Sequence, residues 1–351
     1  MNETSPILAQ MVDRLFADHV DMALLAAASE GHWAQELWAL VEQQGLPWSL
    51  VPEEQGGMGA SFHDAFVIVR ATGRHRAPVP LPETMAAGWL LAMAGLKLPA
   101  GPLTLAGAQS GDSCRLDRSG ADWRLSGSIH RVPWGRVANS VVLTLRHDGK
   151  TLVVQAARNG AVIERAANLA GEFRDTLTFR NHPVEVAPWN HAFTDDPVAV
   201  VGAMMRSGQM AGALADVLAR SVVYVGERQQ FGRPIGKQQA VQQNLAILAE
   251  EVAATETAAE AAFLAFDRGD PEFLVAVAKV RAGIAVSQAV GIAHQVHGAI
   301  GFAREHPLHA STLRLMSWRT EFGGDRRWAV ALGQRVLAEG ADDFWPHITA
   351  G

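Results

Sequence analysis

Cysteine, tyrosine and long apolar runs are almost missing from this chain of 351 residues. Cys114 is the single cysteine, so no disulfide can form within the chain and nothing indicates an oxidising compartment. No window approaches the roughly eighteen uninterrupted apolar residues that a membrane span needs, and the start, Met1 to Phe16, lacks a signal-peptide pattern. The net charge of -6 gives no electrostatic reason to expect nucleic acid. These absences predict a cytoplasmic protein with no membrane span and no nucleic-acid partner.

The spacing of apolar residues changes twice along the chain. In the first part, residues such as Leu8, Met11 and Leu15 recur at helical intervals. Strand-like runs such as Ser140–Leu145 follow, punctuated by turn residues such as Asp148-Gly149, and helical spacing then returns. This order is not the alternation of a doubly wound sheet. It predicts a multi-domain α+β protein with a helical domain, an antiparallel β-barrel or sandwich domain and a four-helix bundle, at residues 1–101, 102–195 and 196–351.

The stretch from Arg228 to Gln239 reads RQQFGRPIGKQQ and separates two helical patterns. Gly232, Pro234 and Gly236 supply the break between them. An arginine at such a turn can hold a phosphate with two parallel hydrogen bonds, which a lysine cannot do. The sequence therefore predicts a helix hairpin that presents a guanidinium, an aromatic ring and an amide together.

This stretch resembles the Arg-x-x-Phe-Gly-x-Pro-Ile-x-x-x-Gln signature of the flavin-dependent acyl-CoA dehydrogenase family, whose three-part architecture is also similar. The segment 42–59, which ends in PEEQGGMG, and the segment 123–139 resemble further parts of that family. The resemblance implies that Arg228, Phe231 and Gln239 contact the FAD of a neighbouring subunit.

A second glycine-containing stretch, Gln295 to Phe302, reads QVHGAIGF and resembles the family's Gln-x-x-Gly-Gly-x-Gly loop. Glycines let a main chain approach a cofactor closely. The resemblance implies that Gln295, Gly298 and Gly301 meet the adenosine and pyrophosphate side of FAD. Ala299 stands where the family has its second glycine, a departure of one methyl group.

Two patterns could suggest a dinucleotide or a metal ligand, but neither is complete enough to predict one. Gly56–Gly59 follows a predicted helix and a Pro-Glu-Glu turn rather than a strand, so it is interpreted as a structural turn and not as a dinucleotide loop. His294, His297, His306 and His309 form two pairs at a spacing of three, but no full set of tetrahedral ligands accompanies them. No metal site is predicted.

The catalytic base is where the resemblance departs from the family. A carboxylate removes the α-proton of the acyl thioester in that family, and burial raises the pKa of such a group towards neutrality. The corresponding region, Trp318 to Asp325, reads WRTEFGGD, and counting from the glycine loop places Phe322 at the base position and Glu321 one residue earlier. A smaller branch carries its base on the first bundle helix, where this chain has Gly202. Glu321 is therefore the candidate base, with an exposed helix-end glutamate as the alternative.

The middle domain departs as well. Where relatives have a Trp-x-Thr string that covers the flavin, this chain has RVPWG from Arg131 to Gly135. Trp134 is predicted either to face the flavin or to lie in the core. The short first and middle domains resemble the branch of the family that degrades steroids and other bulky acyl groups.

The implied activity is FAD-dependent α,β-dehydrogenation of an acyl-CoA, with electrons passed to an electron-accepting flavoprotein or its equivalent. The implied assembly is a homo- or heterotetramer with another acyl-CoA dehydrogenase chain. Two alternatives remain open: a catalytically silent subunit that completes a partner's site, and a flavin monooxygenase of the same fold.

Overall fold

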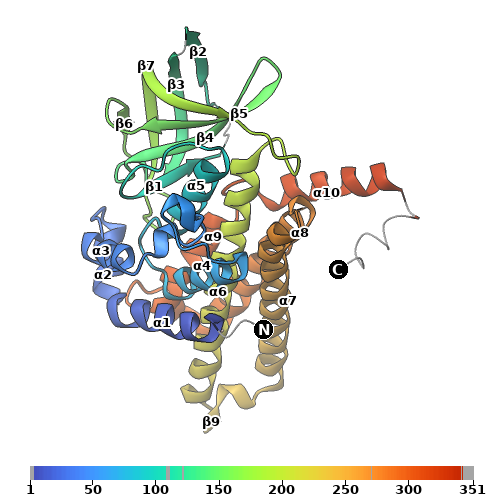
Figure 1. Cartoon of the computed structure of the whole chain (residues 1–351). Coiled ribbons are helices and arrows are strands. Elements are labelled where there is room, and N and C mark those ends of the chain that lie inside the picture. The colour runs from blue at the N-terminus through green and yellow to red at the C-terminus, as the bar shows by residue number, and fades with distance from the viewer. Residues whose placement is uncertain (1–3, 108–110, 121, 270, 341, 343–351) are drawn as a thin grey trace.

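The computed structural model describes residues 4–107, 111–120, 122–269, 271–340 and 342, and it confirms the predicted order of helices, strands and helices (Figure 1). In the first part Asp21 caps a new helix by accepting a hydrogen bond from the Leu24 amide, so a second helix begins just after the first one ends at His19. The elements of this part are α1 (Thr4–His19), α2 (Met22–Ser29), α3 (Gln35–Gln43), the short 3-10 turns η1 (Leu46–Trp48) and η2 (Glu53–Gln55), α4 (Phe62–His75) and α5 (Leu81–Met93).

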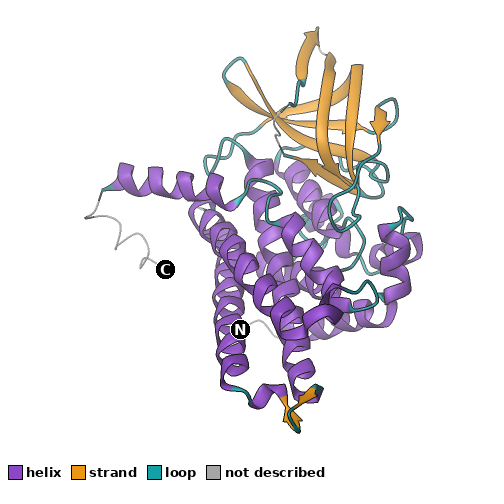
Figure 2. Ribbon diagram, turned by 180° about the vertical axis from the view of Figure 1, so that it is seen from behind, coloured by secondary structure: helices purple, strands orange, loops and turns teal. Residues whose placement is uncertain are grey.

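The middle part is one seven-stranded curved sheet, which lies at one end of the helices (Figures 1 and 2). Its strands are β1 (Leu103–Ala106), β2 (Arg115–Ser119), β3 (Asp122–Pro133), β4 (Ser140–His147), β5 (Lys150–Ala157), β6 (Val162–Glu164) and β7 (Arg174–Pro188). The order is β1-β4-β5-β7-β3-β2, with β6 paired to β7. The prediction of antiparallel pairing is wrong for β1 and β4, which run parallel because β2 and β3 lie between them in the chain.

The β4–β5 hairpin shows how local chemistry fixes a register. Asp148 and Gly149 both adopt positive φ angles, 48° and 75°. A two-residue turn needs such angles so that its twist matches the twist of the flanking strands. All eight residues of β4 pair with β5 in an unbroken ladder. The predicted turn therefore connects the two strands as expected.

Three long helices, α6 (Pro197–Glu227), α7 (Gln239–Arg268) and α8 (Glu272–His297), form the centre of the last part. α7 and α8 are separate helices, and Gly269 ends α7 with a φ of 89°. The remaining elements are β8 (Gln229–Gln230), β9 (Arg233–Pro234), η3 (Ile235–Lys237), η4 (Gly298–Phe302), α9 (Pro307–Trp318) and α10 (Asp325–Glu339).

The first and last parts share one hydrophobic core because α4 lies directly against α6. A Cβ atom on Gly73 would lie 1.9 Å from the Gln209 carbonyl oxygen, and one on Gly212 would lie 1.9 Å from the Arg70 carbonyl oxygen. Only glycine permits such close approach of two helix backbones. The two helical parts therefore form a single support beneath the sheet.

The loop at Gly56–Gly59 folds back on the segment before it. The amides of Met58 and Gly59 donate to the carbonyls of Trp48 and Val51, and a Cβ atom on Gly57 would overlap Val51. The loop follows a 3-10 turn rather than a strand. This geometry agrees with its interpretation as a structural turn.

The segment Glu272–Phe302, which contains α8, is long and apolar enough to cross a membrane by length and composition. Half of its most apolar window is buried inside the fold, where α8 packs against α6, α7 and α10. Its apolar character is accounted for by its central place in the bundle.

Candidate functional site

A cavity of about 500 Å³ lies between the sheet and the last helices. Its volume is within the range of small-molecule sites. We call it the interdomain cavity; it is lined by Gly107, Arg131, Pro133, Ala166, Ala167, Asn168, Leu169, Arg174, Met316, Ser317, Thr320, Glu321 and Phe322. The candidate base Glu321 is thus at a cavity and is not an exposed helix-end residue.

Two arginines hold the Glu321 carboxylate. Arg174 donates to Oε1 from Nε at 2.7 Å and to Oε2 from Nη2 at 3.0 Å, and Arg206 donates to Oε2 from Nε at 2.7 Å. Burial alone would raise the pKa of Glu321, but the two guanidinium groups outweigh it and lower the pKa to about 2. A carboxylate with such a pKa is a weak proton acceptor near neutral pH. Glu321 as placed here is an anchored anion.

The ion pairs continue away from the cavity into the core. Arg206, only 1 % exposed, also donates to Glu83 at 2.6 Å, and Arg174 also donates to Glu172 at 3.0 Å. Burial disfavours the charged form of Arg206, yet Glu83 and Glu321 outweigh this effect and raise its pKa. Sequence reasoning missed these partners. The available signal was an arginine inside the apolar α6, since a buried charge must be paired.

A buried lysine fixes the start of the segment that carries Glu321. Lys279 of α8 donates to the carbonyls of Trp318 at 3.2 Å and Arg319 at 2.7 Å, at the carboxyl end of α9. Its charge complements the free carbonyls there, although burial lowers the pKa of the amine to about 7. The segment after α9 is thereby held in one position.

Phe322 and Gly202, the two positions that the resemblance assigns to a base, lie against each other. Phe322 has a left-handed φ of 52°, and its ring covers Gly202 so closely that a Cβ atom there would lie 2.3 Å from its Cδ1. Arg206 lies over the same ring, with its guanidinium carbon 5.5 Å from the ring centroid. One position thus holds a phenylalanine and the other a glycine, and neither residue offers a carboxylate.

Replacing Gly202 by alanine is expected to lower the free energy of unfolding by about 1–3 kcal/mol, because the new methyl group meets a packed ring. Gly226→Ala in the same helix is the matched control: nothing lies within 4 Å of its Cβ position, and helix propensity predicts a gain of up to about 1 kcal/mol. Urea titration of both variants measures the difference. Equal stability of the two would show that Phe322 does not pack on Gly202 in solution.

The α6–α7 hairpin, residues 228–239, lies at the far end of the bundle from the sheet (Figure 1). Phe231 is 93 % exposed at its tip, with a φ of 53°. Arg228 is exposed where α6 ends, and its carbonyl accepts a hydrogen bond from Ile235 at 2.8 Å. The backbone is closed while both side chains face outward, as expected for groups that contact a second molecule.

The other predicted FAD contacts gather at the same end. Val225 and Ile235 pack on Val296 of α8, so the hairpin lies beside the end of that helix. Gln239 and Gln295 are exposed there. Gly298 has a φ of 64° and a ψ of -147°, with nothing within 4 Å of its Cβ position, whereas Gly301 is packed against His297 and Leu308. An open glycine beside exposed donors fits the phosphate side of FAD.

These outward-facing groups cannot serve the cavity of their own chain. Gly202 and Arg228 are 26 residues apart along α6, which corresponds to roughly 39 Å of helix. A single dinucleotide cannot contact both ends. The interdomain cavity and the exposed hairpin are therefore two separate regions of the chain.

Trp134 lies outside both regions. It is 5 % exposed, and its ring packs edge-on against Trp33 at 6.1 Å and Phe173 at 5.4 Å. Arg131 and Pro133 face the cavity instead. This packing favours the core alternative for Trp134.

Three of the four histidines take part in packing or capping. His294 stacks on Phe302 with ring centroids 4.1 Å apart, and His297 stacks on Tyr224 at 4.4 Å. His306 caps α9 by accepting from the Leu308 amide. Within the described residues, no group of three or more metal-ligating side chains is found.

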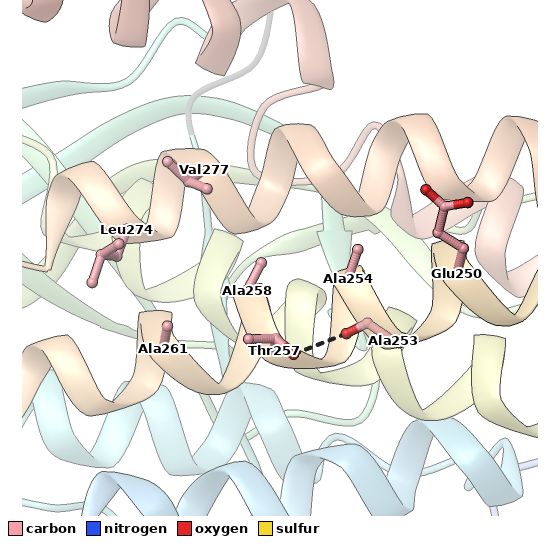
Figure 3. Close-up of a pocket in the computed structure, with 8 residues that line it drawn as sticks. All are labelled: Glu250, Ala253, Ala254, Thr257, Ala258, Ala261, Leu274 and Val277. Carbon is pink, nitrogen blue, oxygen red and sulfur yellow. Dashed lines mark hydrogen bonds between the residues drawn. The ribbon is translucent and has the colours of Figure 1, made fainter. Parts of the chain in front are cut away.

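A second hollow follows the contact between α7 and α8 (Figure 3). Alanines of α7 point towards Leu274 and Val277 across it, and the Thr257 hydroxyl donates back to the Ala253 carbonyl. Glu250 is the one titratable group among the residues that line it. This groove offers surface for packing but no set of groups for chemistry.

The helical domain, the curved sheet, the bundle and the outward-facing Arg-Phe hairpin match the architecture that the resemblance to the acyl-CoA dehydrogenases implies. Two family models match the chain: "Acyl-CoA dehydrogenase, N-terminal domain" at residues 2–97 and "Acyl-CoA dehydrogenase, C-terminal domain" at residues 200–333. The chain belongs to the acyl-CoA dehydrogenase family.

Similar proteins include members of that family from mycobacteria. The acyl-CoA dehydrogenase IpdE2 of Mycobacterium tuberculosis is 28% identical over 311 residues, which cover 88% of this chain and 89% of the relative. The acyl-CoA dehydrogenase FadE34 of the same organism is 31% identical over 292 residues, covering 81% of this chain but 40% of the relative.

Among solved structures, the Tcur3481-Tcur3483 steroid ACAD G363A variant has a TM-score of 0.88 at 26% identity, covering 97% of this chain and 99% of that chain. The ChsE4-ChsE5 complex from Mycobacterium tuberculosis has a TM-score of 0.86 at 22% identity, with the same coverage, and shows the shared fold.

Proposed function

We propose that this chain is a subunit of an FAD-dependent acyl-CoA dehydrogenase and completes the active site of a partner chain that supplies the catalytic base. The observation that carries the proposal is that Phe322 and Gly202, the residues at the two positions that the resemblance aligns with a base, hold no carboxylate and pack against each other. Glu321, the carboxylate that lines the cavity, is instead neutralised by Arg174 and Arg206.

The hairpin supplies this chain's part of the composite site. When bound, FAD accepts a hydride from the acyl group. Arg228 would hold an anionic oxygen of the cofactor with parallel hydrogen bonds, Phe231 would cover its apolar surface, and Gln239, Gln295 and Gly298 would donate from the same end of the bundle. The similarity to a steroid acyl-CoA dehydrogenase and to a two-protein complex supports a heteromeric assembly and a bulky acyl substrate.

Arg228→Ala is expected to lower FAD content at least about tenfold without changing the fold, because it removes an exposed, charge-assisted contact. Arg233→Ala, in the same hairpin, is the matched control and should keep its flavin. Flavin absorbance per chain measures the effect, in protein purified alone and with a co-expressed acyl-CoA dehydrogenase chain that carries its own base. Full FAD content of Arg228→Ala in both preparations would refute the proposal.

A second candidate is an acyl-CoA dehydrogenase that uses Glu321 as its own base, favoured by the place of Glu321 at the cavity. The two candidates differ in whether this chain can oxidise an acyl-CoA without a second kind of chain. Anaerobic bleaching of the flavin by acyl-CoAs in the absence of a second kind of chain would support this candidate. Bleaching only in the mixed assembly supports the proposed function, and a reaction that needs oxygen would indicate the monooxygenase.

A further inference from the structure

A strand irregularity directs one arginine of β3 into the interdomain cavity. Between Ile129 and Val132 the pairing with β7 advances by three residues on β3 but by two on its partner. The extra residue makes a bulge, and Arg131 within it has a left-handed φ of 54°. Bulges beside functional sites commonly re-aim a side chain. The neighbouring His130 stays in the sheet, with its ring 3.2 Å from the Thr176 hydroxyl.

Arg131 is the unpaired charge of this cavity. Its guanidinium has no hydrogen-bond or ion-pair partner in the part of the chain that the structure describes. Arg174 and Glu321 neutralise each other, and the hydroxyls of Ser317 and Thr320 donate to backbone carbonyls. The cavity is thus left with one net positive charge.

The rest of the wall limits the kind of anion that fits. Pro133, Leu169, Met316 and Phe322 present apolar surface to the same space. A mostly apolar site with one placed cation suits a ligand whose carbon skeleton ends in an anion. A planar guanidinium binds a carboxylate through two parallel hydrogen bonds.

We propose that the interdomain cavity binds an acyl-CoA whose acyl group carries a free carboxylate, and that Arg131 is the residue that recognises it. This inference rests on the proposed function, because it takes the chain as part of an assembly that binds acyl-CoA, and it adds a place for the acyl group in this chain and the chemical class of that group. Arg131 determines which acyl-CoA binds and takes no part in proton removal.

The test compares two acyl-CoAs of equal chain length, glutaryl-CoA and pentanoyl-CoA, with CoA alone as a third probe. Calorimetric titration of the full chain should show glutaryl-CoA binding at least about tenfold more tightly than pentanoyl-CoA, equivalent to about 1.4 kcal/mol. Arg131→Gln should remove this difference. Arg180→Gln on β7, an exposed arginine that does not line the cavity, should leave it unchanged.

Several outcomes would overturn the inference. Equal affinity for the two acyl-CoAs in the wild type, no binding of either, or an unchanged preference in Arg131→Gln would each do so. Binding of CoA alone that is weakened equally by Arg131→Gln would assign the arginine to the CoA phosphates. Loss of FAD without loss of acyl-CoA preference would assign it to the cofactor. The proposed function is judged separately, by the FAD content of Arg228→Ala, so a failure of the inference is distinguishable from a failure of the proposed function.

Discussion

Replacing Arg206 by methionine is expected to lower the free energy of unfolding by about 3–5 kcal/mol. The variant keeps a long apolar side chain but leaves the buried carboxylates of Glu83 and Glu321 without their shared partner. Removing one member of a buried ion pair costs far more than the pair contributes, because the remaining charge stays desolvated. Urea titration monitored by tryptophan fluorescence measures the loss.

The control for this result is Arg146→Met. The Arg146–Asp195 pair is exposed, with side chains 63% and 83% accessible, and such pairs contribute little to stability. A matching small effect for Arg206→Met would mean that water reaches the buried network in solution.

Low pH is expected to lower the free energy of unfolding because Glu321 becomes protonated. Its pKa is about 2 in the folded chain, compared with 4.5 for the free group, so its contribution is fully present above pH 4.5 and is lost as the pH falls towards 2. Linkage predicts a loss of about 2 kcal/mol from this group between pH 5 and pH 3. The measurement is the urea midpoint of the full chain at both pH values.

Glu321→Gln isolates that contribution. The variant should be less stable than the wild type at pH 7, since Arg174 and Arg206 lose their shared anion, and its stability should fall less steeply between pH 5 and pH 3. In the mixed assembly its turnover should stay within about threefold of the wild type, whereas loss of a catalytic base lowers turnover by orders of magnitude. A large loss of turnover with FAD retained would identify Glu321 as the base.

Sequence reasoning succeeds where one short segment determines the geometry. The Asp148-Gly149 turn depends on two adjacent residues, and the hairpin after Arg228 depends on glycine and proline within a few positions. Such local chemistry, together with the change of apolar spacing, is enough to predict the three-part architecture.

Sequence reasoning does not predict contacts between segments that are distant in the chain. The partners of Arg206 come from positions 83 and 321, on other elements, and no periodicity connects them. The parallel pairing of β1 with β4 depends on where two intervening strands are placed. The bulge at Arg131 depends on the register of β7, some 45 residues later. Each of these requires the folded arrangement.

The length of α6 has a consequence for inheritance as well as for chemistry. Roughly 39 Å of helix separates the outward-facing hairpin from the cavity, so a change at one end leaves the geometry of the other intact. Under the proposed function, a duplicated gene could lose its proton-removing carboxylate and still be retained, since its hairpin would remain indispensable to the sister chain. Two defective copies, one damaged at each end, would then restore activity when mixed, although neither works alone.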